Sequence, residues 1–239
     1  MNPNSPSIAK LIDHALLHPT LRDGDLRDGC RTAKQLGVAT VCVKPYAVPL
    51  AVEVLQGSDV GVGTVIGFPH GSHTSQVKAF EADVACQQGA VELDMVVNVG
   101  KVLDEDWDYV RNDIQLVKDV ASKHGAVLKV IFETDYVTND RHKQMLCQIC
   151  EAVGVDYVKT STGFGFVKQP SGDYNYVGAT DHDIQLMRAA CGPGVGVKAS
   201  GGVRNYADAV RFRELGATRL GSSASETIVT GEQSAQEGY

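Results

Sequence analysis

The fold is decided by a stretch at residues 127–161, VLKVIFETDYVTNDRHKQMLCQICEAVGVDYVKTS. Its two ends are short runs rich in Val and Ile, and the segment between them has the apolar spacing of a helix. That helix is predicted over 140–153, with Asn139 as its N-cap and Gly154 at its C-terminal end. A strand, a helix and a second strand within this length predict two parallel strands joined by a right-handed crossover.

The same strand-then-helix unit recurs along the chain. Seven intervals of about 30 residues separate eight candidate strands, which begin at Leu11, Thr40, Val62, Val91, Val127, Val155, Val195 and Thr218. Further helices are predicted over 75–88 and 206–215, and Thr180 and Asn205 stand at N-cap positions. Eight such units form a closed barrel or an open doubly wound sheet, and a dinucleotide-binding sheet would carry a Gly-x-Gly-x-x-Gly turn. TVCVKPYAVP at 40–49 carries none, so we predict an α/β fold of the (β/α)8 TIM barrel type.

Length and composition fit one domain. We expect a single barrel domain over residues 1–239, with a short N-terminal extension, a long polar loop over 166–178 and a loose tail from about residue 230. A net charge of −7 argues against nucleic-acid or membrane partners, and no apolar run approaches a membrane span. The opening MNPNSPS does not resemble a signal peptide, and the six cysteines lie mostly in apolar stretches. We therefore expect a cytoplasmic protein with reduced thiols.

Charged residues interrupt several of the apolar strands. Lys129, Lys159 and Lys198 lie in the fifth to seventh strands, and Asp13 and Asp94 lie in the first and fourth. Because the fifth to seventh strands are neighbours in a barrel, the three lysines can project into one space. Ammonium groups within about 4–6 Å of one another disfavour the charged form, and burial acts in the same direction. A neutral lysine amine can attack an aldehyde or ketone, and the resulting iminium accepts the electrons of a breaking carbon–carbon bond.

Two interpretations of these charges stay open at this point. In the first, one lysine is a nucleophile and Asp94 or Asp13 moves protons. In the second, lysines and aspartates form a structural network inside the barrel. Several lysines on adjoining strands favour the first interpretation. Cys42, near the end of the second strand, either lines the same pocket or is a small buried thiol.

Glycine-rich turns follow the last three strands. They read TSTGFG at 160–165, SGGVR at 200–204 and GSS at 221–223. Backbone N–H groups exposed by glycine can surround a phosphate, and barrels commonly bind phosphate after the seventh and eighth strands. Each turn alone is an ordinary connection, but their joint placement predicts a phosphorylated substrate.

Several longer motifs resemble one enzyme family, the deoxyribose-phosphate aldolases. They are VKTSTGFG (158–165), VKASGGVR (197–204), ELDMVVNVG (92–100), IGFPHG (66–71) and LIDHALL (11–17). The resemblance runs from about Leu11 to about Ser223. It implies a class I aldolase, independent of metals and cofactors, that reversibly cleaves 2-deoxyribose 5-phosphate to acetaldehyde and glyceraldehyde 3-phosphate. It also implies a role in nucleoside metabolism.

The resemblance implies roles for individual residues as well. Lys159 matches the Schiff-base lysine, Lys198 the second lysine that keeps it deprotonated, and Asp94 the acid/base residue that works through water. The candidate substrate-binding residues, from the strands and turns together, are Asp13, Lys129, Cys42, Gly163, Gly201, Gly202, Arg204, Gly221, Ser222 and Ser223. The expected partner is a small phosphorylated sugar, and a homodimer is one assembly open to the chain.

Three positions depart from the family pattern. Ala15 stands where Thr is usual and Ala224 where a second Ser is common, so hydroxyl groups near the substrate are missing. The loop after Gly163 carries Phe164 and is longer than usual, with Lys168 as an alternative contact for phosphate. Two rival functions stay open: a phosphate-binding barrel isomerase with a carboxylate acid/base pair, and a non-catalytic barrel that binds a sugar phosphate.

Overall fold

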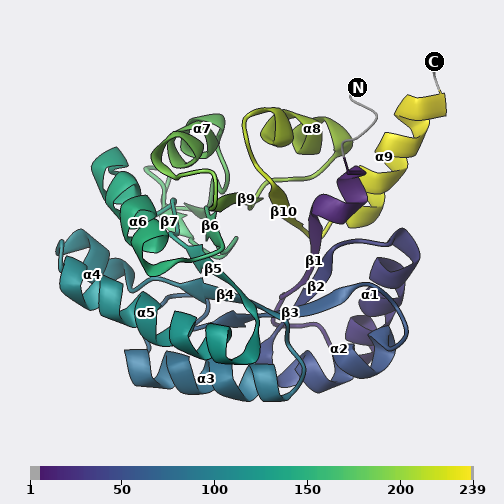
Figure 1. The fold of residues 1–239 in the computed structure, drawn as a ribbon. Helices are drawn as coiled ribbons and strands as arrows, with labels where there is room; N and C mark the ends of the chain where they lie inside the picture. Colours follow the sequence, from purple (N-terminus) through teal and green to yellow (C-terminus); the bar gives the residue numbers. More distant parts are fainter. Residues whose placement is uncertain (1–5, 238–239) are drawn as a thin grey trace.

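The computed structural model describes residues 6–237, and its parallel strands close into a barrel (Figure 1). The barrel strands are β1 Ile12–Leu16, β2 Thr40–Val43, β3 Gly61–Ile66, β4 Glu92–Val96, β5 Val127–Ile131, β6 Tyr157–Lys159, β9 Gly196–Ser200 and β10 Arg219–Ser222. Their order is β1-β10-β9-β6-β5-β4-β3-β2, and β1 pairs with both β2 and β10. The predicted fold and its eight strands are confirmed.

Helices connect the strands and cover the outside of the barrel (Figure 1). They are η1 Ile8–Leu11, α1 Asp23–Leu36, η2 Pro45–Ala47, α2 Val48–Leu55, α3 Ser75–Gln87, α4 Val99–Leu103, α5 Trp107–His124, α6 Asp140–Val153, α7 Asp181–Ala190, α8 Tyr206–Glu214 and α9 Ser225–Glu237. The three helices predicted from the sequence are confirmed to within one residue at each end. The side chains of Asn139, Thr180 and Asn205 accept first-turn N–H groups, as predicted. Within residues 6–237, no helix combines the length and apolarity needed to cross a bilayer.

The segment 166–178, predicted as a long loop, contains regular structure. It forms an antiparallel hairpin of β7 Val167–Lys168 and β8 Tyr174–Asn175. Gly172 makes the tight reversal possible with a φ of 94°. The polar composition of this segment fits a hairpin end as well as a loop, so the sequence did not separate the two.

The chain end predicted as a loose tail from about residue 230 is helical instead. α9 covers it and lies beside η1 (Figure 1). Ile228 is fully buried, and Glu232 accepts the N–H of Ile8 at 3.2 Å. Packing against the N-terminal turn therefore orders a segment whose polar sequence suggested disorder. Residues 1–5 of the predicted N-terminal extension and residues 238–239 lie outside the described part.

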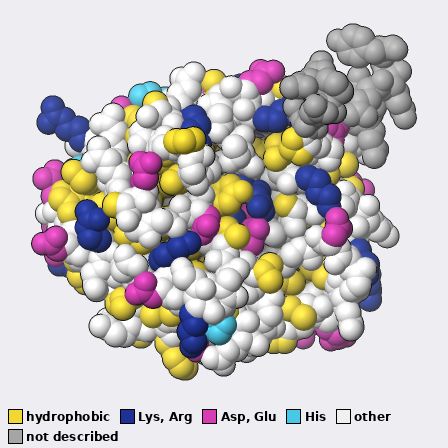
Figure 2. All heavy atoms as spheres, in the orientation of Figure 1, with side chains coloured by type: hydrophobic (Ala, Val, Ile, Leu, Met, Phe, Trp, Pro, Cys, Tyr) yellow, Lys and Arg dark blue, Asp and Glu magenta, His cyan; other side chains and the backbone are white. Residues whose placement is uncertain are grey.

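Strand side chains alternate between two environments. One set points outward and forms the hydrophobic core beneath the helices, with Val41, Leu93, Leu128, Val158 and Leu220 among its members. The other set points into the barrel and includes the charged residues that sequence analysis singled out. Figure 2 shows side chains of both charges close together near the centre of the face seen along the barrel. The unusual feature of this fold is therefore a charged interior.

A buried ion pair joins two helices on the outside of the barrel. Lys78 on α3 and Asp113 on α5 are almost fully buried, with Nζ 2.6 Å from Oδ2. Lys78 also donates to the carbonyl oxygen of Val96, at the end of β4, at 2.9 Å. Burial lowers the pKa of Lys78, and the attraction of Asp113 opposes that shift. The ion pair thus connects α3 and α5 to each other and to the end of β4.

Removing this carboxylate should destabilise the fold strongly. We expect Asp113→Ala to lower the free energy of unfolding by about 3–5 kcal/mol, because it leaves a buried ammonium unpaired. The control is Asp59→Ala, which breaks an exposed pair with Lys10 and should cost less than about 1 kcal/mol. Urea denaturation followed by circular dichroism measures both. Equal losses in the two variants would contradict the role assigned to the buried pair.

Candidate functional site

Three lysines share one carboxylate inside the barrel. In the strand register, Asp94 on β4 lies opposite Lys129 on β5, and Lys159 on β6 lies opposite Lys198 on β9. The Nζ of Lys129 lies 2.8 Å from Asp94 Oδ1. The Nζ atoms of Lys159 and Lys198 each lie 2.6 Å from Asp94 Oδ2. All four side chains are buried, so the three lysines do project into one space, as the sequence predicted.

Two more carboxylates and an arginine adjoin these residues. Asp13 Oδ2 lies 2.5 Å from Lys198 Nζ and 3.2 Å from Lys129 Nζ. Glu92 lies 2.5 Å from Lys129 Nζ. Arg219 connects the two acids, with Nη1 at 2.6 Å from Asp13 Oδ1 and 3.1 Å from Glu92 Oε2. We call the following seven residues the charge cluster: Asp13, Glu92, Asp94, Lys129, Lys159, Lys198 and Arg219.

Sequence analysis missed two members of the charge cluster, Glu92 and Arg219. Glu92 lies two residues before Asp94, and Arg219 lies two residues before Gly221. Residues two apart on a strand share a face, so strand alternation could have placed both inside the barrel. Arg219 also lies over the ring of Tyr157, 5.3 Å from its centroid.

The surroundings give the three lysines different pKa values. Burial opposes the charge of Lys129, yet three carboxylates raise its pKa well above the usual value. Burial also opposes the charge of Lys198, but Asp13 and Asp94 raise its pKa. The pKa of Lys159 is lowered: burial has the largest effect, and the charge of Lys198 adds to it against the attraction of Asp94. Of the three, Lys159 therefore becomes neutral most easily.

Cys42 lies in the barrel wall beside the charge cluster. It is buried on β2, opposite Ala15 of β1. Burial raises the pKa of its thiol to about 11, and Asp94 acts in the same direction. The thiol therefore stays protonated near neutral pH and is a poor nucleophile. Ala15 leaves this part of the wall without the hydroxyl group that the sequence analysis noted as missing.

The glycine turns after β6 and β9 lie at the carboxyl ends of neighbouring strands. Gly163, Gly201 and Gly202 have φ values of 81°, 84° and 82°, which side chains rarely adopt. Gly201 packs so closely on Gly178 that a Cβ on Gly178 would lie 2.7 Å from the Gly201 carbonyl oxygen. The N–H of Ala179 donates to that oxygen at 3.0 Å. Ligands of parallel barrels bind at this end of the strands.

Gly221 lies within β10 rather than in the turn that follows. A Cβ at this position would lie 2.8 Å from Ser200 Oγ and 3.2 Å from Lys198 Cε. Gly221 therefore makes room for the aliphatic part of Lys198 inside the barrel.

The other candidates after β9 and β10 have different environments. Ser222 Oγ donates to the carbonyl oxygen of Val203 at 2.6 Å and accepts the N–H of Ala224 at 3.0 Å, so it holds the turn before α9. Ser223 is exposed beside it. Arg204 is also exposed, and within residues 6–237 its guanidinium forms no ion pair with the charge cluster. The structure does not bring Arg204 to the lysines.

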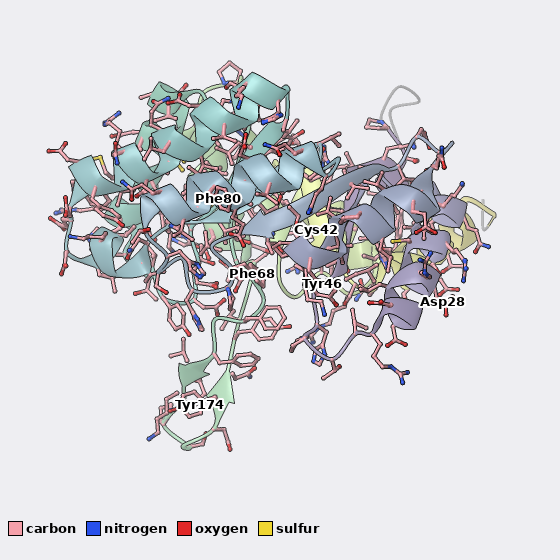
Figure 3. All side chains as sticks on the ribbon, turned by 90° about the horizontal axis from the view of Figure 1, so that it is seen from below. Asp28, Cys42, Tyr46, Phe68, Phe80 and Tyr174 are labelled. Carbon is pink, nitrogen blue, oxygen red and sulfur yellow. The ribbon has the colours of Figure 1, made fainter. Side chains whose placement is uncertain are left out.

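Lys168 lies on the hairpin and not at the glycine turns. Figure 3 shows the hairpin standing away from the barrel, with Tyr174 near its end. The Lys168 side chain is exposed, and among the described residues it forms no hydrogen bond or ion pair with those turns. At the base of the loop, Phe164 packs edge-on against Phe68, with ring centroids 5.4 Å apart.

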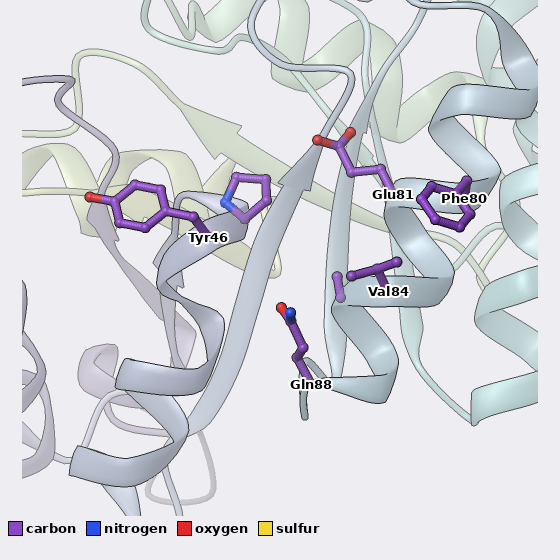
Figure 4. Close-up of a pocket in the computed structure, with 7 residues that line it drawn as sticks. Tyr46, Phe80, Glu81, Val84 and Gln88 are labelled. Atoms are coloured by element: carbon purple, nitrogen blue, oxygen red, sulfur yellow. The ribbon is translucent and has the colours of Figure 1, made fainter.

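A cavity of about 300 Å³ lies outside the barrel, between η2 and α3. Figure 4 shows Tyr46 on one side of it and Phe80 and Val84 on the other. Its one carboxylate among the lining residues is that of Glu81, which accepts the N–H of Gly67 at 2.7 Å. This cavity is separate from the charge cluster and is largely apolar.

One group of side chains in the described residues has the spacing of a metal site. Asp140, His182 and Asp183 offer ligand atoms within 4.8 Å of one another. However, the ammonium of Lys143 lies 2.5 Å from Asp183 and 3.3 Å from Asp140. Lys143 therefore supplies the positive charge that a metal ion would bring.

Comparison with known proteins gives one consistent result. A family model described as DeoC/LacD family aldolase matches residues 7–224. The chain is 46% identical to a deoxyribose-phosphate aldolase of Clostridium perfringens over 95% of its length and 96% of that protein. It is 46% identical to one of Thermococcus gammatolerans, covering 96% and 98%. Two solved structures are also similar: a putative deoxyribose-phosphate aldolase of Coccidioides immitis (TM-score 0.87, 39% identity, covering 96% and 88%) and the tetrameric enzyme of Aeropyrum pernix (0.84, 29%, 95% and 92%).

The space that Gly221 leaves for Lys198 can be tested by filling it. We expect Gly221→Ala to lower the free energy of unfolding by about 1–3 kcal/mol, because the new methyl group displaces a buried ammonium side chain. Gly63→Ala is the matched control, since a Cβ there meets Glu92 at an ordinary 3.4–3.5 Å. Urea denaturation compares the two variants. A Gly221→Ala protein as stable as the control would show that Lys198 does not need this space.

Proposed function

The chain belongs to the DeoC/LacD family of aldolases, and on that premise we propose that it cleaves 2-deoxyribose 5-phosphate reversibly through a Schiff base on Lys159. The products are acetaldehyde and glyceraldehyde 3-phosphate. The names of the relatives support the substrate. The observation that carries the proposal is the environment of Lys159. Within residues 6–237 it pairs with one carboxylate, that of Asp94, and its pKa is lowered by burial.

The balance of charge in the charge cluster favours a neutral Lys159. The cluster has four basic and three acidic side chains, so one positive charge is in excess when all are ionised. Arg219 cannot lose its proton at neutral pH. Lys129 and Lys198 each contact more than one carboxylate. Loss of the proton from Lys159 removes the excess positive charge and breaks the fewest ion pairs. It also produces the neutral amine that attacks a carbonyl.

The proposed reaction starts when neutral Lys159 condenses with C1 of the open-chain sugar and water is lost. The C3 hydroxyl then gives up its proton, the C2–C3 bond breaks, and the electron pair moves into the iminium to form an enamine. Glyceraldehyde 3-phosphate leaves. Protonation of the enamine at C2 and hydrolysis release acetaldehyde and return the amine. Asp94, 2.6 Å from Lys159 Nζ, is the proposed acid and base through a water molecule.

Lys198, Asp13 and Lys129 support this chemistry in the proposal without reacting. Lys198 keeps its own proton because Asp13 and Asp94 stabilise the charge, and that charge disfavours a second ammonium at Lys159. Lys129 neutralises the carboxylates deeper in the barrel.

The phosphate group of the substrate is proposed to bind at Gly163, Gly201 and Gly202. Their positive φ values support this, because such backbone presents N–H groups to an anion without a side chain in the way. Ser223 adds an exposed hydroxyl at the end of β10. Barrel enzymes commonly bind phosphate in this region.

The rival functions have less support. An isomerase with a carboxylate acid/base pair would have no use for a neutral amine. Burial, with the charge of Lys198, lowers the pKa of Lys159, which supports an amine nucleophile instead. A barrel that only binds phosphate has no use for a lysine with a lowered pKa.

Other expectations from the sequence stay proposals. They are a single domain over residues 1–239, a cytoplasmic location, a role in nucleoside metabolism and assembly as a homodimer. The relative from Aeropyrum pernix is described as a tetramer. The mass of the protein in solution is therefore the measurement that decides its assembly.

Trapping the Schiff base tests the proposed nucleophile. We expect acetaldehyde and borohydride to add one ethyl group, located on Lys159 by peptide mass spectrometry, because reduction fixes the iminium. Lys159→Met should remove both the label and the cleavage activity. Lys168→Met, which changes an exposed lysine on the hairpin, should keep both. A fully active protein that acquires no label would contradict the mechanism.

A second prediction concerns the pH dependence of activity. The charge of Lys198 helps to lower the pKa of Lys159, so Lys198→Met should raise that pKa. The alkaline-going rise of kcat/KM should then move to higher pH by about one to two units, with lower activity at neutral pH. Lys198→Arg keeps the charge and should shift the profile less. A pH–rate profile that is the same in all three proteins would contradict the coupling of the two lysines.

A further inference from the structure

Glu133 is a buried carboxylic acid that the proposed reaction does not use. It lies two residues beyond the end of β5 and is 1% exposed. The N–H groups of Phe132 and Thr134 donate to the carbonyl oxygens of Lys159 and Thr160, at 2.9 and 3.1 Å. Glu133 itself has a φ of 57°, in the left-handed region that few side chains adopt. Backbone pairing with the β6 segment therefore continues on both sides of Glu133, while Glu133 departs from the strand conformation.

The loop after β6 is built around this carboxyl group. Glu133 Oε1 accepts the N–H of Thr162 at 3.3 Å, and Oε2 is hydrogen-bonded to Thr162 Oγ1. Thr162 Oγ1 also accepts the N–H of Phe164 at 2.9 Å, which closes the turn at Gly163. A Cβ on Gly165 would lie 2.9 Å from the carboxyl carbon of Glu133. The chain therefore passes directly over the acid, and Glu133 sets the shape of the turn.

Asp135 holds the other end of the same loop. Its carboxylate accepts the N–H of Val177 at 2.6 Å and that of Gly178 at 3.1 Å. Gly178 is the residue whose backbone packs against Gly201. Glu133 and Asp135 therefore fix the two ends of the segment that contains the hairpin, and each end adjoins a glycine turn.

We propose that Glu133 is a positioning residue for the phosphate group of the substrate. It acts through Thr162, by holding the turn at Gly163 so that backbone N–H groups and the Thr162 hydroxyl face a phosphate ester. In the part of the chain that the structure describes, the exposed side chains of Lys168 and Arg204 form no hydrogen bond or ion pair with this turn, so the proposal assigns the binding to the geometry of the backbone. This inference rests on the proposed function for the identity of the phosphate ester.

The protonation of Glu133 decides what the Thr162 hydroxyl can do. Burial raises the pKa of Glu133 to about 7 against the hydrogen bonds from Thr162, while Asp135 raises it further and Lys159 lowers it. Tyr136 also faces this acid, and burial raises its pKa. As a carboxylate, Glu133 accepts the hydroxyl proton of Thr162. As a neutral acid it donates to Thr162 Oγ1, which frees that hydroxyl proton for the phosphate.

Two variants separate this role from a purely structural one. The amide of Glu133→Gln accepts from the N–H of Thr162 and donates to its Oγ1, as the neutral acid does, whereas Glu133→Ala does neither. We expect Glu133→Ala to raise the KM for 2-deoxyribose 5-phosphate by about tenfold or more. The kcat/KM for unphosphorylated 2-deoxyribose should change by less than about twofold. Glu133→Gln should keep a low KM.

The pH dependence of KM is the second readout. A raised pKa means that the wild-type acid is neutral below about pH 7 and charged above it. The KM of the wild type for the phosphorylated sugar should therefore rise as the pH passes through about 7, because the carboxylate repels the phosphate and takes up the Thr162 hydroxyl. Glu133→Gln has no proton to lose, so its KM should rise less. An equal rise in the two proteins would overturn the proposal.

Binding of inorganic phosphate, measured by calorimetry, tests the inference independently of catalysis. A wild-type protein that cleaves no sugar would refute the proposed function, and phosphate binding would still decide the role of Glu133. We expect binding to be kept in Glu133→Gln and lost in Glu133→Ala. The control is Asp156→Ala, which removes a carboxylate that accepts the N–H of Leu128 at the opposite end of the barrel. Unchanged phosphate binding in Glu133→Ala, or an equal loss of activity on both sugars, would overturn the proposal.

Discussion

The interior of this barrel depends on one buried carboxylate, that of Asp94, which contacts the amines of three lysines. Taking an ion out of water costs several kcal/mol unless it is paired, so lysines remain inside only where carboxylates accompany them. Lys159 and Lys198 share one oxygen of Asp94, which keeps two positive charges close together. Lys198 has a second partner in Asp13, on β1 beyond β10, and Lys159 has no second carboxylate partner within residues 6–237. This inequality makes one amine different from the other two.

The strand register sets Lys129 apart from the other two lysines. Lys129 pairs in register with Tyr157, two residues before Lys159, so it enters the barrel one layer deeper. At that depth it contacts Glu92 as well as Asp94, and its pKa rises. Lys159 pairs with Lys198 and lies in the layer nearer the carboxyl ends of the strands. A shift of two residues along adjoining strands therefore separates Lys129 from the other two lysines, and the contact with Asp13 separates Lys198 from Lys159.

The sequence predicted those features that depend on local pattern. The Val- and Ile-rich strands and their spacing predicted the barrel. A lysine in the middle of an apolar strand indicated either an ion pair with a carboxylate or a catalytic role, because burial of an unpaired charge is costly. The interior position of Arg219 and the hairpin over 166–178 were harder to predict. A single arginine at the start of a strand does not show which face it occupies, and a polar segment fits a loop as well as a hairpin. Glu133 could not be recognised at all from its sequence, since its left-handed backbone and its bond to Thr162 both depend on tertiary packing.

Adjoining strands also connect the chemistry to the binding of phosphate. Lys159 and Thr162 are three residues apart on one chain segment, a separation of about 10 Å where the backbone is extended. β5 borders this segment and contributes Lys129 to the charge cluster, and Glu133, two residues beyond the end of β5, holds the turn. The backbone that presents the amine is thus continuous with the backbone that would hold the phosphate. In the proposed mechanism, a sugar whose carbonyl carbon and phosphate are separated by the wrong length would not reach both, so discrimination by chain length would follow from the spacing along one chain segment rather than from a dedicated side chain.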